Sequence, residues 1–324
     1  MSNEVQVSNE VRDRFARVNQ RDLHYVDEGT GQPLVLVHGW GFDLTCWRPM
    51  IDRLATRYRV IAVDVRGHGR SQPADSAYTL KDLALDLSEL LTQLNLPEPP
   101  VLIGHSLGGS IVQQFAAEHP NAARAIIIMD SDLNASVAKR LIMSSTNRIF
   151  AWVMRLAAVI LGPKRSLRLY PPLLNIATYS GGWRKAHPEL LKDAADRFLD
   201  NRVKDLVWSL VAWASRPDLT ENLAAVSCPA LLIRGSKDLM ITDASMQALS
   251  RAFPRSQLLV VEDSGHAILS EQPDIVVGMI DSFLQQPDAN AERDSAVRDH
   301  SDSQRRSLSG LSTSTTVTSS LLTN

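Results

Sequence analysis

A serine between glycines follows an aliphatic run at residues 100–109, which read PVLIGHSLGG. The pattern places Ser106 at the end of a strand and immediately before a helix, as G-x-S-x-G turns do. Gly104 and Gly108 suit such a sharp turn, because a side chain at either position would collide with neighbouring backbone. The sequence therefore predicts a nucleophile elbow that holds the Ser106 hydroxyl out above the edge of a sheet.

A serine hydroxyl is a weak nucleophile until a base takes its proton, and that base must itself be oriented by a third group. With this kind of turn, the chain order is serine, then acid, then histidine. The stretch RGSKDLMI supplies Asp238 just past one strand, and EDSGHAILSEQP supplies His266 just past the next. Ligands of open α/β sheets bind at the carboxyl ends of the strands. We therefore predict that Ser106, Asp238 and His266 form a catalytic triad.

A candidate oxyanion site accompanies these side chains. The motif VHGWG at 37–41 ends an earlier strand, and its glycines allow the backbone to turn amides toward a pocket. We assign the backbone N–H groups of Trp40 and Leu107 to the developing oxyanion. Removing one such donor typically costs ~3–4 kcal/mol of transition-state stabilisation, so two aligned amides would matter as much as the base.

The elements that must position these residues alternate between strand and helix. Strands are predicted at 34–40, 59–65, 101–106, 125–131, 229–236 and 257–264, and helices near 45–56, 79–95, from 107, near 242–253 and near 272–286. Near-continuous Val, Ile and Leu in these strands is typical of a parallel sheet that is covered by helices on both faces. Upstream, FARVNQRDLHYVDEG alternates like a hairpin, which would add an antiparallel edge. The predicted fold class is α/β.

The strand and helix alternation stops between about Leu133 and Ala224, where the apolar spacing is helical and prolines interrupt it. We predict a core at 1–132 and 225–286, a helical cap at 133–224 inserted after the sixth strand, and a disordered Ser/Thr-rich tail at 287–324. Four tryptophans of the cap are expected to form its own core and its seat, with a minority lining an apolar pocket: Trp152, Trp183, Trp208 and Trp213.

Composition excludes several classes of function. The 324 residues are 44% hydrophobic and 22% charged, with 34 basic against 36 acidic residues. Because these charges are spread along the sequence, we expect no basic field for nucleic acid or acidic membranes, and a small, uncharged partner.

Cysteine spacing and apolar segments are also informative. Cys46 and Cys228 have no metal-binding spacing and are not expected to pair. The N-terminus lacks an apolar signal region, which predicts a cytoplasmic protein. The apolar stretch 149–162 is too short for a membrane span and predicts an amphipathic helix.

With these motifs in place, residues 20–286 resemble the α/β-hydrolase superfamily, and in particular its single-domain serine esterases with a helical cap. The resemblance depends on HGWG, DVRGHGRS at 64–71, GHSLGG, Asp238 and His266. It implies a serine hydrolase that cleaves a carboxylic ester, thioester or lactone of a hydrophobic small molecule through an acyl-enzyme, without cofactor or metal. In that family the loop at 64–71 is structural, so Asp64, Arg66 and His68 receive no chemical role.

Some residues compete for these roles. Asp130 and Asp132 follow the sixth strand, where some members of the superfamily carry the acid, although the position of Asp238 after a strand favours Asp238. Asp263 is interpreted as a loop-capping residue. His105 and His38 are interpreted as packing and hydrogen-bonding residues, with His38 bracing the oxyanion turn.

Two other functions remain open at this point. The same fold hosts carbon–carbon bond hydrolysis, cyanohydrin cleavage and cofactor-free perhydrolase or haloperoxidase chemistry, which the sequence separates poorly from ester hydrolysis. Dehalogenases and epoxide hydrolases of this fold place an aspartate at the elbow, where this chain has Ser106. A small-molecule receptor with little turnover is the alternative from another class, because a fold hosts many functions.

Overall fold

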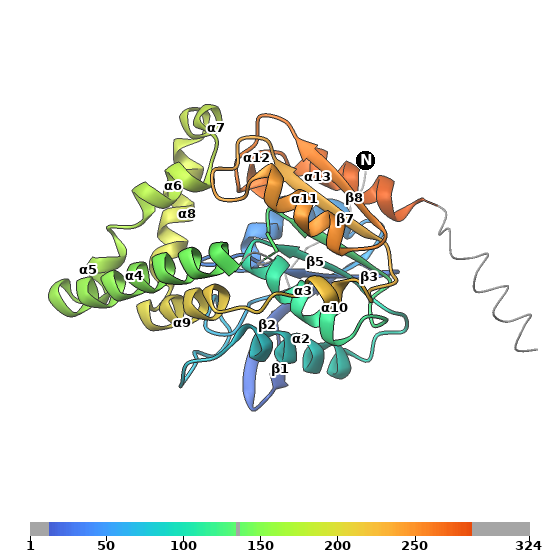
Figure 1. Ribbon diagram of the computed structural model, residues 1–324, viewed down its shortest axis with the longest axis horizontal. Coiled ribbons are helices and arrows are strands. Elements are labelled where there is room, and N and C mark those ends of the chain that lie inside the picture. Colours follow the sequence, from blue (N-terminus) through green and yellow to red (C-terminus); the bar gives the residue numbers. More distant parts are fainter. Residues whose placement is uncertain (1–12, 134–136, 287–324) are drawn as a thin grey trace, which may run out of the picture. The chain divides into compact units, whose positions relative to one another are not determined.

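The computed structural model describes residues 13–133 and 137–286 (Figure 1). Eight strands form one sheet in the order β1-β2-β4-β3-β5-β6-β7-β8. Their bounds are β1 (Arg14–Val18), β2 (Arg21–Glu28), β3 (Pro33–Val37), β4 (Arg59–Val63), β5 (Val101–His105), β6 (Ala125–Met129), β7 (Ala230–Gly235) and β8 (Ser256–Val261). The pairs β1–β2 and β2–β4 are antiparallel, and the remaining pairs are parallel. The predicted parallel sheet with an antiparallel edge is confirmed.

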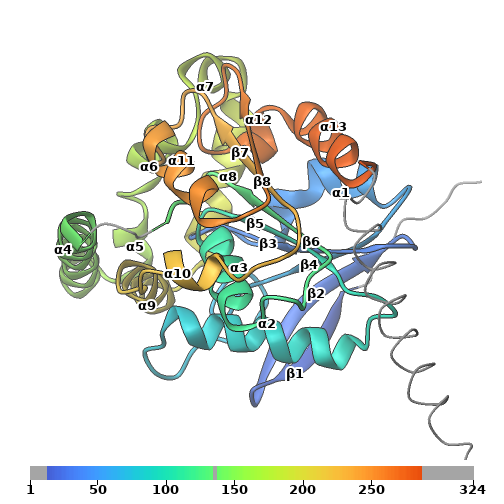
Figure 2. The ribbon, with the colours of Figure 1, turned by 45° about the vertical axis from the view of Figure 1, so that its right-hand side comes forward.

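Helices between the strands cover the sheet. They are η1 (Leu44–Trp47), α1 (Arg48–Leu54), α2 (Leu80–Leu94), α3 (Leu107–Glu118), α11 (Asp243–Ala252), α12 (Ile268–Glu271) and α13 (Pro273–Leu284). Thr79 begins α2 with a capping box: its hydroxyl accepts from the Asp82 N–H, and the Asp82 carboxylate accepts from the Thr79 N–H. Figure 2 shows α1 on the opposite side of the sheet from α2 and α3. The predicted α/β layering is confirmed.

Among the residues that the structure describes, seven helices fall between β6 and β7 in the chain. They are α4 (Val137–Leu161), α5 (Pro163–Leu167), α6 (Pro171–Thr178), α7 (Gly181–Ala186), α8 (Pro188–Asp200), α9 (Val203–Ala214) and α10 (Thr220–Leu223). Prolines occupy the first turns of α5, α6 and α8, where proline is tolerated, and not the interior of a helix. This explains why prolines interrupt the helical spacing of apolar residues in the sequence. In Figure 1 the helices α4 to α9 lie to the left of the sheet.

The core lies against the central strands. Every residue of β3, β5, β6 and β7 is buried, as a parallel strand covered on both faces requires. These strands are adjacent in the sheet and run in the same direction, so their carboxyl ends meet along one edge. The loops that carry Trp40, Ser106, Asp130 and Asp238 all begin at that edge.

The contacts divide the chain into a unit that ends at Ile280 and a second unit that begins at Asp281, of which residues up to 286 are described. The tail predicted at 287–324 lies outside the described residues. Cys46 is partly buried and Cys228 is buried. Across the described residues, we find no helix with the length and apolar character needed to cross a membrane.

Candidate active site

Ser106 occupies the strained turn between β5 and α3. Its backbone has φ 52° and ψ −116°, a conformation that side chains other than glycine rarely adopt, and its N–H donates to the Met129 carbonyl at 2.9 Å. A Cβ at Gly104 would lie 2.4 Å from the Gly108 carbonyl oxygen, and one at Gly108 would lie 2.0 Å from the Val37 carbonyl oxygen. The two glycines therefore let strand and helix approach closely enough to form the turn.

Asp238 and His266 form a buried hydrogen-bonded pair. His266 Nδ1 and Asp238 Oδ2 are 2.8 Å apart, and the two side chains are 3% and 0% exposed. Asp238 Oδ1 also accepts from the backbone N–H groups of Met240 at 2.6 Å and Ile241 at 3.0 Å. Burial alone would raise the pKa of Asp238, but the His266 ring and these donors hold that pKa below its usual value. Asp238 is thus an ionised partner that orients the ring.

The side chains of His105 and Glu271 hold the loop around His266 through hydrogen bonds. The His105 ring Nε2 donates to the His266 carbonyl at 2.7 Å, and burial lowers the pKa of His105 to about 3. Glu271 Oε1 accepts from the Gly265 N–H at 3.0 Å and from the Ser180 N–H at 3.1 Å. His105 therefore has the hydrogen-bonding role predicted for it. Sequence reasoning missed Glu271, since no motif marks this residue and its partners are set by loop conformation.

Ser106 and His266 share the wall of one cavity with a volume of about 390 Å³. Trp40 and Leu107, the two residues assigned to the oxyanion, line it as well. Leu107 is the first residue of α3, so its N–H is among the four that a helix leaves without an intrahelical partner. The positive end of α3 also favours negative charge that develops beside Ser106.

The remaining walls of this cavity are mostly apolar, with Asn175 and Thr178 among the exceptions, and come largely from the helices between β6 and β7. They include Phe150 of α4, Leu174 of α6, Phe198 of α8 and Trp213 of α9. Among the described residues that line it, none is Asp, Glu, Lys or Arg. Trp213 thus belongs to the predicted minority of pocket-lining tryptophans. Trp152 differs from the expectation that the cap tryptophans are packed in its core or seat, because 62% of Trp152 is exposed.

The turn that carries Trp40 is held by side chains from distant segments. The Trp40 ring Nε1 donates to the Leu206 carbonyl at 2.8 Å, which ties the turn to α9. His38 Nδ1 donates to the Gly39 carbonyl at 2.8 Å, and His38 Nε2 accepts from the Val65 N–H at 2.9 Å. These contacts agree with the prediction that His38 braces this turn.

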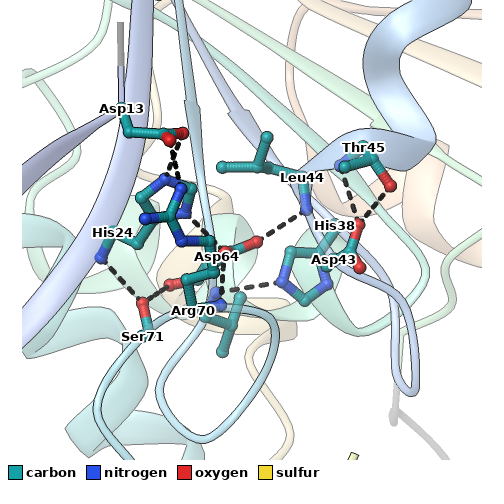
Figure 3. A network of polar contacts seen from close by, with 10 residues as sticks. Asp13, His24, His38, Asp43, Leu44, Thr45, Asp64, Arg70 and Ser71 are labelled. Carbon is teal, nitrogen blue, oxygen red and sulfur yellow. Dashed lines mark hydrogen bonds and ion pairs between the residues drawn. The ribbon is translucent and has the colours of Figure 1, made fainter. Parts of the chain in front are cut away.

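The loop after β4 supports the same turn through Asp64 (Figure 3). The Asp64 carboxylate accepts from the N–H groups of Leu44 at 2.7 Å and Arg70 at 2.8 Å, and its Oδ2 lies 2.7 Å from His24 Nδ1. Ser71 completes the loop by donating to the Asp64 carbonyl at 2.6 Å. All these bonds are internal to the scaffold, consistent with the structural role expected of this motif.

The two rival acids have other partners. Asp130 is fully buried and its Oδ1 accepts from the Gly235 N–H at 2.9 Å. Burial, reinforced by the negative charge of Asp238, raises the pKa of Asp130 well above its usual range. Asp132 is ion-paired with Arg216, which stacks on the Trp213 ring at 4.3 Å. The histidine at this site is therefore bonded to Asp238 rather than to either residue after β6.

His105, Asp130 and His266 also have donor atoms within 4.8 Å of one another, a spacing that could suit a metal ion. Each of these side chains already has a protein partner: His266 bonds to Asp238, His105 to the His266 carbonyl, and Asp130 to the Gly235 N–H. Hydrogen bonding accounts for the cluster, and we assign it no metal.

Comparisons with known proteins place the chain in a family. Residues 32–273 match the family model described as the alpha/beta hydrolase fold. The chain is 29% identical to a poly(3-hydroxyalkanoate) depolymerase from Ectopseudomonas oleovorans, over 78% of this chain and 84% of that protein. It is 28% identical to a pimeloyl-[acyl-carrier protein] methyl ester esterase from Aeromonas hydrophila, over 79% and 96%.

Solved structures agree with this assignment. A thermophilic esterase from Thermogutta terrifontis superposes with a TM-score of 0.75 at 28% identity, covering 85% of this chain and 98% of the esterase. An enol-lactonase from Burkholderia xenovorans shares the fold with a TM-score of 0.71 at 22% identity, covering 84% and 100%. The chain belongs to the alpha/beta hydrolase family and is a hydrolytic enzyme.

Proposed function

We propose that this enzyme is a serine hydrolase that cleaves carboxylic esters, thioesters or lactones of uncharged, hydrophobic small molecules, with residues 133–224 acting as a cap over the site. One observation carries the proposal. Ser106 and His266 line the same apolar cavity, and His266 is hydrogen-bonded to the buried carboxylate of Asp238.

The proposed reaction has two halves. His266 Nε2 takes the proton of Ser106 as Oγ attacks the carbonyl carbon, and the N–H groups of Trp40 and Leu107 stabilise the oxyanion. The histidine then returns the proton to the leaving oxygen or sulfur, which departs as an alcohol or thiol or, in a lactone, remains on the acyl chain as a hydroxyl group. Water, activated by the same base, attacks the acyl-enzyme and releases the carboxylic acid. Asp238 keeps the His266 ring in the tautomer that presents Nε2 as the acceptor.

The cavity defines the substrate class. A volume of about 390 Å³ is within the range of small-molecule sites, and its aromatic and aliphatic walls favour an apolar acyl or alcohol group. Because Asp, Glu, Lys and Arg are absent from its described lining, a substrate carboxylate would lose its hydration without gaining a counter-charge. The relatives named as a methyl ester esterase and as an esterase support ester chemistry.

Covalent labelling tests the proposal. A fluorophosphonate probe should label the wild-type enzyme and leave Ser106→Ala unlabelled, because the probe reacts with an activated serine hydroxyl. The wild type should also hydrolyse p-nitrophenyl esters, with activity rising from acetate to medium-chain acyl groups. Ser106→Ala and His266→Ala should each lose several orders of magnitude in kcat, and the double variant should be no worse, because the two residues act as a unit.

Two results would contradict the proposal. Full ester turnover by purified Ser106→Ala would remove the serine from the mechanism. Labelling of wild type without turnover of any ester would instead favour a receptor with little turnover, because the nucleophile would be present but the acyl-enzyme would not be resolved.

A further inference from the structure

The second half of helix α4, from Ile149 to Leu161, is apolar except for Arg155, and one side of it is exposed in the part of the chain that the structure describes. Ala151 and Met154 are buried on the side that packs against α9. The opposite side exposes large apolar side chains, among them Trp152 at 62% and Val159 at 83%. We call this side the outer face of α4; it consists of Ile149, Trp152, Val153, Leu156, Val159 and Ile160. A surface helix normally turns its polar side to solvent, whereas here large apolar side chains are exposed opposite the packed side.

The spacing of these residues makes them one surface. Ile149, Trp152, Leu156 and Val159 are separated by three or four positions, so they lie above one another along a single side of the helix. In Figure 2, α4 lies at the left edge of the ribbon with α9 on its inner side. Single exposed apolar residues are normal, but a row of them on one helix marks an interaction site.

The segment of sequence that contains this face carries charge of one sign. Between Asp132 and Glu189 the sequence holds nine Lys and Arg residues and no Asp or Glu, although the whole chain has a formal charge of −2. Arg148 and Arg155 of α4 and the three basic residues Lys164, Arg165 and Arg168 of the following segment are exposed. The basic and acidic residues, which are otherwise spread along the sequence, are therefore unevenly distributed in this segment.

We propose that the outer face of α4 docks on an anionic lipid surface. Apolar side chains would enter the boundary between headgroups and acyl chains, while the arginines and lysines beside them would meet lipid phosphates. Trp152 within this face suits this depth, because tryptophan favours the membrane interface. A second copy of this chain fits less well, since two such faces would bring cations of the same sign together without a counter-charge.

The outer face of α4 lies close to the cavity. Phe150 lines the cavity, and its sequence neighbour Ile149 is 63% exposed on the outer face. A bilayer on α4 would therefore lie one helix diameter from the cavity wall, about 10 Å. The docking proposal rests on exposure and charge alone and does not depend on the reaction that the enzyme catalyses.

Vesicle co-sedimentation of the full chain tests the proposal. Binding is expected to vesicles of phosphatidylcholine mixed in equal parts with phosphatidylglycerol, but not to phosphatidylcholine alone, and added salt should weaken it. The double variant Trp152→Ser with Val159→Ser should reduce partitioning by about tenfold or more, because it removes apolar area from the lipid boundary. Arg155→Gln should reduce it about fivefold.

Matched controls separate the outer face from general surface effects. Leu85→Ser removes an apolar side chain of α2 that is 42% exposed, and Arg251→Gln removes an exposed cation of α11; both should bind anionic vesicles as the wild type does. The melting temperatures of all four variants should stay close to that of the wild type, which shows that each remains folded.

Three results would overturn the proposal. The first is failure of the wild type to bind anionic vesicles, and the second is equal binding by the outer-face variants and the controls. The third is a concentration-dependent dimer in analytical ultracentrifugation that the Trp152→Ser and Val159→Ser variant dissociates, which would assign the face to a second copy of the chain.

Discussion

At the scale of single residues, two buried carboxyl groups end neighbouring strands of the site and have opposite electrostatic environments. Asp238 receives two backbone N–H groups and the His266 ring, which keep its pKa low. Asp130 receives one N–H, from Gly235, and is buried beside the charge of Asp238, which keeps its pKa high. The surroundings of Asp238 therefore favour its charged form and those of Asp130 favour its protonated form, so Asp238 is the carboxylate suited to stabilise an imidazolium.

Asparagine substitutions distinguish the three candidate acids. Asp238→Asn should lower kcat by on the order of 10⁴, because the amide would favour the wrong tautomer of His266. Asp130→Asn should stay within about tenfold of wild type, since an asparagine resembles a protonated carboxyl group and its oxygen can still accept from Gly235. Steady-state hydrolysis of a p-nitrophenyl ester measures both.

Asp132→Asn provides the remaining comparison. Breaking its buried ion pair with Arg216 should lower the free energy of unfolding by about 3–5 kcal/mol, while the folded fraction retains activity. A large loss of kcat in Asp130→Asn or folded Asp132→Asn, with Asp238→Asn near wild type, would move the acid to the end of β6.

The sequence predicted the three residues of the proposed triad but not their supporting contacts. Ser106, Asp238 and His266 could be found because each follows a strand, and parallel strands bring their carboxyl ends together whatever the loops do. The bonds from Met240 and Ile241 to Asp238, and from Gly265 to Glu271, depend on loop conformations that no spacing pattern encodes.

At the scale of elements, the helices between β6 and β7 supply most of the apolar wall of the cavity. Sequence periodicity predicted helices there, but it could not tell which apolar residues face the cavity. Leu173 and Leu174 are adjacent in α6, yet Leu174 lines the cavity whereas Leu173 is 66% exposed. Only the packing of α6 against other helices separates the two.

This pair offers a matched test of substrate selection. Leu174→Ala should enlarge the cavity and shift the kcat/KM ratio toward longer acyl chains, by ~1–3 kcal/mol for each methylene-sized change in fit. Leu173→Ala removes the same atoms from the surface and should leave the chain-length profile unchanged. Rates on p-nitrophenyl butyrate and octanoate give the ratio. An identical profile for both variants would mean that α6 does not contact the acyl group.

At the scale of the whole molecule, the fold was predictable because its strands are continuous apolar runs separated by helical periods. Predicted and observed strands differ by a few residues, as at 34–40 against Pro33–Val37. The outer face of α4 was harder to anticipate, since an apolar helical pattern does not distinguish a buried helix from an exposed one. The burial of polar residues could not be predicted from the sequence either. It is expected to make the free energy of unfolding depend strongly on pH in the acid range.

Two buried histidines are expected to lower the free energy of unfolding as the pH falls. His68 and His105 are each 1% exposed, and burial lowers the pKa of both to about 3. In the unfolded chain a histidine binds its proton near pH 6.5, so below that pH the unfolded state gains protons that the folded state excludes. The free energy of unfolding should therefore fall with falling pH, by about 1.4 kcal/mol per pH unit for each of these histidines.

Urea unfolding at pH 7 and pH 5 should show this loss, and two variants should change it in opposite directions. His105→Gln should reduce the loss of unfolding free energy by about 2 kcal/mol, because the proton that folded His105 excludes no longer favours the unfolded state.

His24 should have the opposite effect. Burial alone would lower the pKa of His24, but hydrogen bonds to Asp64 and Asp13 raise it. This residue therefore adds stability below pH 6.5, and that stability is lost as the pH rises through the pKa of His24 in the folded chain. His24→Gln should therefore enlarge the loss between pH 7 and pH 5. Parallel pH profiles for wild type and both variants would show that these rings are protonated alike in the folded and unfolded chains.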